Sequence, residues 1–138
     1  MNQLTEHVSM KEYACKHCGK VPPEFDTNPL YGMLFDIFED IRRRWGKPIV
    51  INSGYRCPEH PETKKKPYSV HVFGLALDLG CKSAAEAKRM YQIINDNYPA
   101  LRIGYKQYKK EGTNIIHIDI GFHINPKLLP EYTQGARW

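Results

Sequence analysis

The chain has 138 residues, of which 41% are hydrophobic and 25% charged, and its formal charge is +5 at neutral pH. This length fits one compact domain over residues 1–138 that buries a core without metal or disulfide cross-links, and the composition excludes a disordered chain. The mild basic charge is compatible with nucleic acid, a membrane surface or another anionic polymer, and it selects none of them.

Neither a membrane-spanning segment nor a secretory signal is recognisable in the sequence. No apolar run is long enough to cross a bilayer, and residues 1–7 lack the basic and apolar regions of a signal peptide. We therefore expect a protein that is cytoplasmic when made and that reaches any target outside the cell by another route, such as lysis.

Two helices are expected in the first third of the chain. Residues 9–12 (Ser-Met-Lys-Glu) are typical of a capping box and predict a short helix that runs into Cys15. After a loop over residues 19–27, Asn28 is expected to cap a long helix that ends at Gly46. Apolar residues recur along it at helical spacing and predict a buried face: Leu30, Leu34, Ile37, Phe38, Ile41 and Trp45.

The rest of the chain mixes strands with one further helix. Strands are predicted at 48–52, 75–79, 101–105 and 114–121, and a second capping box opens a helix over 83–97. Residues 57–70, with three prolines, are expected to form a long loop, and the tail with Pro126 and Pro130 is expected to be irregular. Without a regular strand–helix–strand repeat, the expected class is α+β, a small and mainly antiparallel sheet with flanking helices.

Four cysteines leave their state open. Cys15 and Cys18 have the two-residue spacing that lets both thiolates reach one tetrahedral ion, so a second, structural zinc ion is one interpretation. A closed site needs two further ligands, which Cys57, Cys81 or His60 would supply. Inert or disulfide-linked cysteines fit the sequence equally well.

His71 and Asp78 form the first pair of residues that could take part in catalysis or metal binding. A turn at Gly74 that leads into the strand at 75–79 can bring the imidazole and the carboxylate to one point. Small Ala76, on the same strand face as Asp78, leaves room for a ligand. The spacing alone is common, so an ordinary surface aspartate and a loop histidine remain an alternative.

The last predicted strand carries a second polar pair. One face holds Ile116, Ile118 and Ile120, while His117 and Asp119 lie on the other. By itself this pair is explained by a hydrogen-bonded His and Asp on a solvated face. Together with the pair at 71 and 78, it supplies two histidines and an aspartate, which leave a tetrahedral zinc ion with an open position for water.

Three segments then resemble a known family. Residues 69–78 are similar to the Ser-x-His-x-x-Gly-x-Ala-x-Asp signature of zinc D-alanyl-D-alanine peptidases, a family that shares its fold with the hedgehog signalling domain and includes endolysins and murein endopeptidases. Residues 53–60 (Ser-Gly-Tyr-Arg-Cys-Pro-Glu-His) resemble the preceding block, and residues 117–121 resemble the third block of its small single-domain branch. The segments follow in the family's order, so the resemblance implies a hedgehog/DD-peptidase-like fold.

The resemblance also implies roles for particular residues. The zinc ligands of the family fall on His71, Asp78 and His117, which predicts one catalytic zinc ion. Arg56 is implied to hold a substrate carbonyl or carboxylate and to stabilise the developing oxyanion, as a rigid, permanently charged guanidinium can. Ser69 resembles a serine that contacts the substrate.

One departure concerns the general base. Many family members carry Glu or Asp three residues before the last zinc histidine, and this position is Asn114 here. Asp119, on the strand face of His117, is the expected substitute. The reverse assignment, with Asp119 as third ligand and His117 as acid/base, also stays open.

The expected function is therefore zinc-dependent hydrolysis of peptide bonds in bacterial peptidoglycan, of the D,D-carboxypeptidase or murein endopeptidase/endolysin type. We expect a monomer that acts on the cell wall after release and binds neither nucleic acid nor membrane. The alternative is a non-catalytic zinc-binding interaction domain of the same fold, which the missing acid at position 114 supports. A nucleic-acid-binding domain would leave the four polar residues of the two pairs unexplained.

Overall fold

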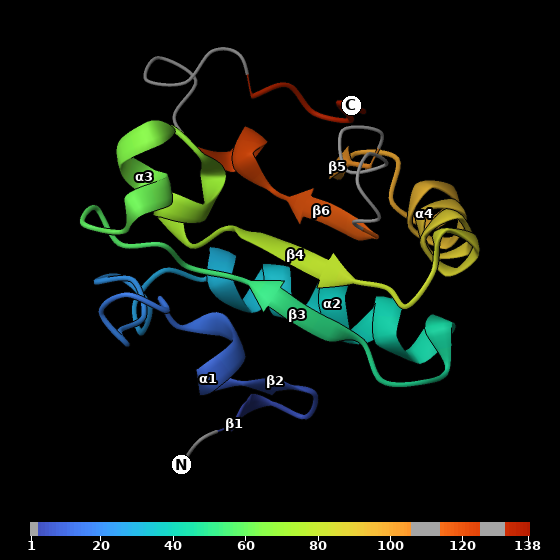
Figure 1. The fold of residues 1–138 in the computed structure, drawn as a ribbon, viewed down its shortest axis with the longest axis horizontal. Helices are drawn as coiled ribbons and strands as arrows, with labels where there is room; N and C mark the ends of the chain where they lie inside the picture. Colours follow the sequence, from blue (N-terminus) through green and yellow to red (C-terminus); the bar gives the residue numbers. More distant parts are fainter. Residues whose placement is uncertain (1–2, 106–113, 125–131) are drawn as a thin grey trace.

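A four-stranded antiparallel sheet forms the centre of the molecule. The computed structural model describes residues 3–105, 114–124 and 132–138 (Figure 1). The strand order is β3-β4-β6-β5, and each neighbouring pair is antiparallel. The strands are β3 (Val50–Ser53), β4 (Ala76–Gly80), β5 (Arg102–Gly104) and β6 (Ile115–Asp119). The predicted α+β class with a mainly antiparallel sheet is confirmed.

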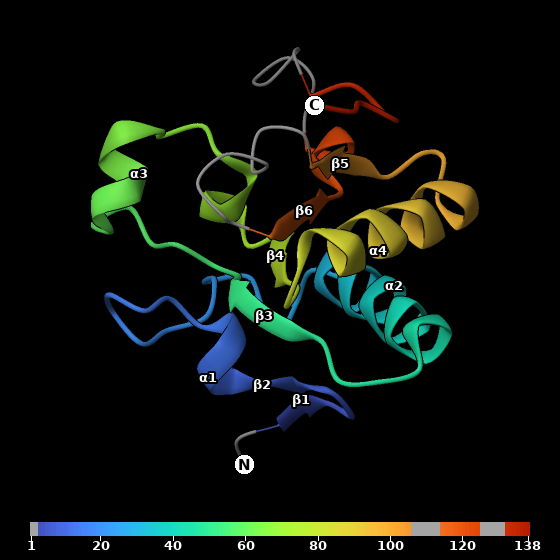
Figure 2. The ribbon, with the colours of Figure 1, turned by 45° about the vertical axis from the view of Figure 1, so that its right-hand side comes forward.

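Helices α2 (Leu30–Trp45) and α4 (Ala84–Asn97) lie side by side against the sheet (Figure 2). Gly46, with a φ of 81°, ends α2 as predicted. Ser83 caps α4 by accepting a hydrogen bond from Glu86 N, at 3.1 Å. None of the described helices is long and apolar enough to cross a membrane.

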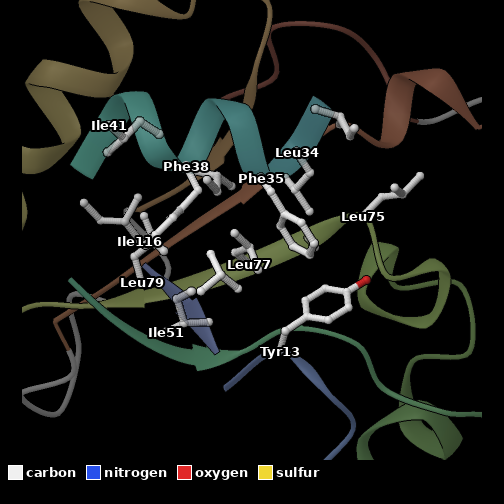
Figure 3. Packing of buried hydrophobic residues seen from close by; sticks show 14 of the residues in the cluster. Tyr13, Leu34, Phe35, Phe38, Ile41, Ile51, Leu75, Leu77, Leu79 and Ile116 are labelled. Atoms are coloured by element: carbon white, nitrogen blue, oxygen red, sulfur yellow. The ribbon is translucent and has the colours of Figure 1, made fainter. Parts of the chain in front are cut away.

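The core lies between α2 and one face of the sheet. Leu77 pairs with Ile118, and Leu79 pairs with Ile116, so these four side chains share that face. They pack against the apolar stripe of α2, where Leu34, Phe38 and Ile41 are fully buried (Figure 3). Burial of each side chain of this kind contributes about 1.5–3 kcal/mol.

The opposite face of the same strands is polar. Asp78 pairs with His117, whose other neighbour is Gly104 on β5. One row further along, Asp119 pairs with Ala76 on one side and Arg102 on the other. Because side chains alternate along a strand, this register gathers the polar residues of three strands on one patch of sheet.

The N-terminus adds a hairpin that the sequence analysis missed. Strand β1 (Gln3–Thr5) pairs with β2 (Val8–Ser9) and leads into α1 (Met10–Tyr13). The predicted capping box is present, because Ser9 Oγ accepts from Glu12 N and the Glu12 side chain returns to the backbone of Ser9. The helix ends at Tyr13, whose carbonyl accepts a hydrogen bond from Tyr55 N, so Cys15 lies just beyond it.

The expectation of one long loop over residues 57–70 is wrong. The region 57–70 is not only loop, because His60 caps a short helix α3 (Pro61–Lys65) with proline at its first turn, a position where proline favours helix. It is followed by the 3₁₀ helix η1 (Val70–Phe73).

The described end of the tail, residues 132–138, contains no helix or strand, as expected, but an isolated bridge joins it to the sheet: Arg137 pairs in parallel with Ile103, and Trp138 N donates to Ile103 O. The predicted strand 114–121 stops at Asp119, and the 3₁₀ helix η4 (Gly121–His123) follows. The predicted irregular segment around Pro126 and Pro130 lies outside the described residues.

Candidate metal centre

Three predicted ligands converge on the polar face of the sheet. Asp78 Oδ1 lies 3.1 Å from His71 Nε2 and 2.9 Å from His117 Nδ1. The three residues offer ligand atoms that all lie within 4.8 Å of one another. Tetrahedral zinc with bonds of about 2.0–2.1 Å separates its ligand atoms by about 3.3 Å. The spacing therefore fits a small tetrahedral ion.

The orientation of His71 also favours a cation. Its Nδ1 lies 2.6 Å from the carbonyl oxygen of Gly54, which only accepts, so Nδ1 carries the ring proton and Nε2 keeps its lone pair. That Nε2 is buried and makes no hydrogen bond to the described residues. Burial also lowers the pKa of His71, which keeps the ring neutral. A lone pair aimed at a carboxylate oxygen is repulsive unless a cation lies between them.

The turn at Gly74 holds His71 in this position. His71 lies in η1, and Gly74 closes that helix with a φ of 74°, a conformation that favours glycine. Tyr13 Oη donates to Gly74 O at 2.7 Å, which ties the turn to the core. The predicted turn is confirmed.

His117 is held from both sides. Its Nδ1 faces Asp78, and its Nε2 lies 2.6 Å from Asp119 Oδ2. Burial acts to lower the pKa of His117, but the hydrogen bonds and charges of Asp119 and Asp78 outweigh it and raise the pKa to about 9. Metal-bound histidines commonly donate their second N–H to a carboxylate or carbonyl. Both histidines of this site have such a partner.

Asp119 lies at the nitrogen of His117 that points away from Asp78. Its side chain is 1% exposed, and its Oδ1 accepts hydrogen bonds from Arg102 Nε and Gly121 N, both at 2.8 Å. The structure thus brings Asp119 to the site as a partner of His117. Of the two ligand assignments left open by the sequence, this geometry favours the one with His117 beside His71 and Asp78.

Arg56 and Ser69 also lie at the site. A guanidinium nitrogen of Arg56 is 3.3 Å from Asp78 Oδ2, and its backbone N donates to His71 O. Burial acts to raise the pKa of Asp78, but the hydrogen bond with His117 and the close approach of both imidazole rings outweigh it and hold that pKa well below its usual range. Ser69 Oγ accepts from His71 N at 3.3 Å and caps η1.

A cavity of about 320 Å³ opens over these residues. Its lining includes Arg56, Ser69, His71, His117 and Asp119. It also includes residues that the sequence analysis did not assign to the site: Lys66, Pro67, Tyr68, Val70, Arg102, Tyr132 and Trp138. Among the described lining residues, three side chains are cationic and one carries a carboxylate, so the cavity suits a ligand with carbonyl or carboxylate groups.

Arg102 and Trp138 are the most informative of the residues that were missed. The Arg102 guanidinium lies 4.9 Å from the Trp138 ring centroid, and the His117 ring lies 5.4 Å from the same ring. Trp138 resembles the closing residue of the family's small branch, but no chemistry was assigned to it, because the tail pairing that places it at the cavity is not periodic. Arg102 had one weak signal, since it alternates with Ile103 and therefore lies on the polar face beside Asp119.

Comparison with known proteins agrees with the geometry. A family model described as Peptidase M15 matches residues 6–119, which include every predicted ligand. No curated protein and no solved structure matches the chain. The match covers most of the sequence, and it confirms the resemblance to zinc D-alanyl-D-alanine peptidases. The chain belongs to the peptidase M15 family.

Proposed function

We propose that this member of the peptidase M15 family is a zinc-dependent enzyme that hydrolyses peptide bonds of bacterial peptidoglycan. The observation that carries the proposal is the convergence of His71 Nε2, Asp78 Oδ1 and His117 Nδ1 beneath a cationic cavity. Peptidoglycan peptides suit this cavity because they present carboxylates next to the bonds that are cut. The signature over residues 69–78 supports the same substrate class.

A zinc ion held by His71, Asp78 and His117 would supply a Lewis acid and lower the pKa of its water to about 7. The protein's own residues position the substrate around it. Arg56 is half-buried at the cavity wall, where its guanidinium can hold a substrate carboxylate or the oxygen that gains charge in the transition state. Ser69 lies on the same wall, and we propose that it contacts the substrate backbone.

Asp119 has two candidate roles. It is the one carboxylate among the described lining residues, which supports the predicted role as general base. However, Oδ1 is held by Arg102 and Gly121, and Oδ2 by His117, so proton transfer to Asp119 requires one of these hydrogen bonds to open. Asp119 can orient His117 without any rearrangement of these hydrogen bonds. We infer that its main role is to orient His117. The role as general base stays a prediction.

The test is digestion of purified cell-wall sacculi by the zinc-loaded protein. We expect new amino groups and released peptides, whose masses identify the bond. Free D-alanine would indicate a carboxypeptidase, and monomers released from cross-linked dimers would indicate an endopeptidase. His71→Ala should abolish release, whereas His123→Ala, at an exposed histidine on η4, should not. No release by folded, zinc-loaded wild type would overturn the proposal.

A second candidate function is a non-catalytic zinc-binding interaction domain. The observation that favours it is Asn114, which takes the position of the family's acid and cannot accept a proton. The same assay separates the two functions. Protein that binds zinc and sediments with sacculi, but releases no peptide, would support the second.

A further inference from the structure

Three of the four cysteines come together away from the cavity. Cys15 lies just after α1, Cys18 follows in the same turn, and Cys57 lies between β3 and α3. Their sulfur atoms all lie within 4.8 Å of one another. Residues about forty positions apart therefore present three thiol groups to one point, as a tetrahedral thiolate site requires.

The backbone around Cys15 is arranged to stabilise a thiolate. The backbone N–H of His17 donates to Cys15 Sγ at 3.4 Å, and that of Cys57 donates to the same sulfur at 3.3 Å. Burial acts to raise the pKa of Cys15, but hydrogen bonds from Cys57, Cys18 and His17 outweigh it and lower the pKa to about 7. Two backbone N–H groups that point at one buried sulfur suit a thiolate, which is the form that binds metal.

Cys81 does not belong to this cluster. Val50 pairs with Gly80, so Cys81 lies beyond the end of the sheet where β3 begins, whereas Cys57 follows the end of β3. Cys81 Sγ instead lies 3.8 Å from Met90 Sδ, and burial raises its pKa to about 11. Of the ligands that the sequence left open, the fold retains Cys57 and excludes Cys81.

His60 is the candidate fourth ligand on the Cys57 side, although it is not among the residues whose ligand atoms lie within 4.8 Å of one another, so its side chain would have to turn toward the three sulfur atoms. It follows Cys57 by three positions, the same separation as Cys18 from Cys15, in a turn closed by a hydrogen bond from His60 N to Cys57 O. Its ring contacts that of His17, with 6.2 Å between centroids. His60 Nδ1 accepts from Glu62 N at 3.0 Å, which leaves Nε2 as the nitrogen available to a metal ion. His17 is more exposed and lies between two ligands of one turn.

We propose that Cys15, Cys18, Cys57 and His60 bind a structural zinc ion. The ion would tie the segment after α1 to the loop that leads into α3. Arg56 is the residue directly before Cys57, so the ion would also fix the backbone that carries this arginine to the cavity. The proposal does not depend on catalysis, because it concerns a second ion bound by different residues.

Metal content and cobalt spectra test the proposal in the full chain, purified under reducing conditions. We expect Cys18→Ser, at an exposed position, to lose one zinc equivalent relative to wild type, and His71→Ala to lose a different one. With Co²⁺, the thiolate-to-metal charge-transfer band should appear in wild type and His71→Ala and be absent from Cys18→Ser. Cys81→Ser is the matched control and should keep both the metal and the band.

Three outcomes would overturn the structural site: no thiolate band in wild type, equal zinc content in wild type and Cys18→Ser, or a disulfide that joins Cys15 to Cys57. The fourth ligand has its own comparison. Under competition with a chelator, His60→Ala should release the thiolate-bound ion at lower chelator concentration than His17→Ala. Equal release from both variants would contradict the assignment of His60.

Discussion

A chain of contacts links Arg102 to the candidate metal ligands. Arg102 binds Asp119, Asp119 binds His117, and His117 faces Asp78. Each link joins a pair that the strand register places side by side, except the local pair His117 and Asp119, which alternate along one strand. A carboxylate behind a metal-bound histidine fixes the ring and increases its basicity.

This series of contacts predicts the effect of Asp119→Asn. If Asp119 orients His117, the asparagine amide keeps the shape of the side chain but is a weaker hydrogen-bond acceptor for the His117 ring. The affinity for zinc should then fall about 10–100-fold. Competition with a chromophoric chelator measures it, with Asp36→Asn on the exposed face of α2 as the control. Unchanged zinc affinity together with lost turnover would instead assign Asp119 as the general base.

Arg56→Lys tests the second residue role. Lysine keeps the positive charge but loses the planar fork that can bind two oxygens at once. We expect kcat/KM on a peptidoglycan peptide to fall about 10²–10³-fold, the range for loss of an oxyanion donor, with zinc content unchanged. Arg44→Lys, an exposed position on α2, should have no such effect. Loss of zinc in Arg56→Lys would show that the residue acts chiefly through Asp78.

The candidate metal ligands could be predicted from the sequence, but most of the residues around them could not. His71 and Asp78 were predictable because both lie in a local motif with a glycine turn between them, and His117 because a polar residue interrupts an apolar strand pattern. Arg102, Trp138 and the Gly54 carbonyl were not assigned to the site. Their positions depend on which strands are neighbours and in what register, and no local pattern encodes this.

At the scale of elements, the turn after η1 sets the position of His71. A Cβ added to Gly74 would overlap the Pro22 ring and lie 2.6 Å from Tyr13 Oη, and the φ of 74° is itself unfavourable for alanine. Gly46 has a similar backbone conformation, but a Cβ added there would have no neighbour within 4 Å. The two glycines therefore separate backbone strain from overlap.

We expect Gly46→Ala to lower the free energy of unfolding by about 1 kcal/mol and Gly74→Ala by more than about 2 kcal/mol. Gly74→Ala should also weaken zinc binding, because it displaces the turn that holds His71. Urea unfolding followed by zinc titration measures both. Equal destabilisation by the two variants would contradict the packing described for Gly74.

The N-terminal hairpin is fixed to α2 through Glu39. Its carboxylate accepts hydrogen bonds from Thr5 Oγ1 at 2.6 Å and His7 N at 2.8 Å, and it pairs with His7 Nδ1 at 2.6 Å. Burial acts to raise the pKa of Glu39, but these hydrogen bonds outweigh it and lower the pKa. A pKa that is lower in the folded state makes the ionised form stabilising.

Glu39→Gln should therefore destabilise the protein in a pH-dependent way. The stabilisation is fully present above the ordinary glutamate pKa of about 4.3 and is lost as the pH falls through the lower folded-state value. At neutral pH we expect the free energy of unfolding of Glu39→Gln to be about 1–3 kcal/mol lower than that of the wild type. This difference should become smaller in acid. Glu6→Gln, at an exposed position, is the control. A difference in stability that does not change with pH would contradict the ionised contact.

Elements with strong local signals were predictable, and those made by pairing were not. The apolar stripe and the terminal glycine define α2, and the capping residues define α1 and α4. The hairpin β1–β2 escaped notice because it is short and its register contains an irregularity. The helix α3 was hidden by prolines, although proline at the first turn favours a helix.

For the whole molecule, the two faces of the sheet have separate roles. The face against α2 buries the apolar residues that stabilise the fold, and the other face carries Asp78 and His117, which η1 completes with His71 as the third candidate ligand. Because His117 and Asp78 alternate with core residues on the same strands, the core also fixes the positions of the ligands. The C-terminal segment completes the cavity wall through Trp138.

Anomalous diffraction at the zinc edge, from crystals grown with zinc, tests the central claim most directly. We predict a peak bounded by His71 Nε2, Asp78 Oδ1 and His117 Nδ1, with bonds of about 2.0–2.2 Å. No peak at these three side chains, or a peak bound by Asp119 in place of His117, would contradict the metal centre described here.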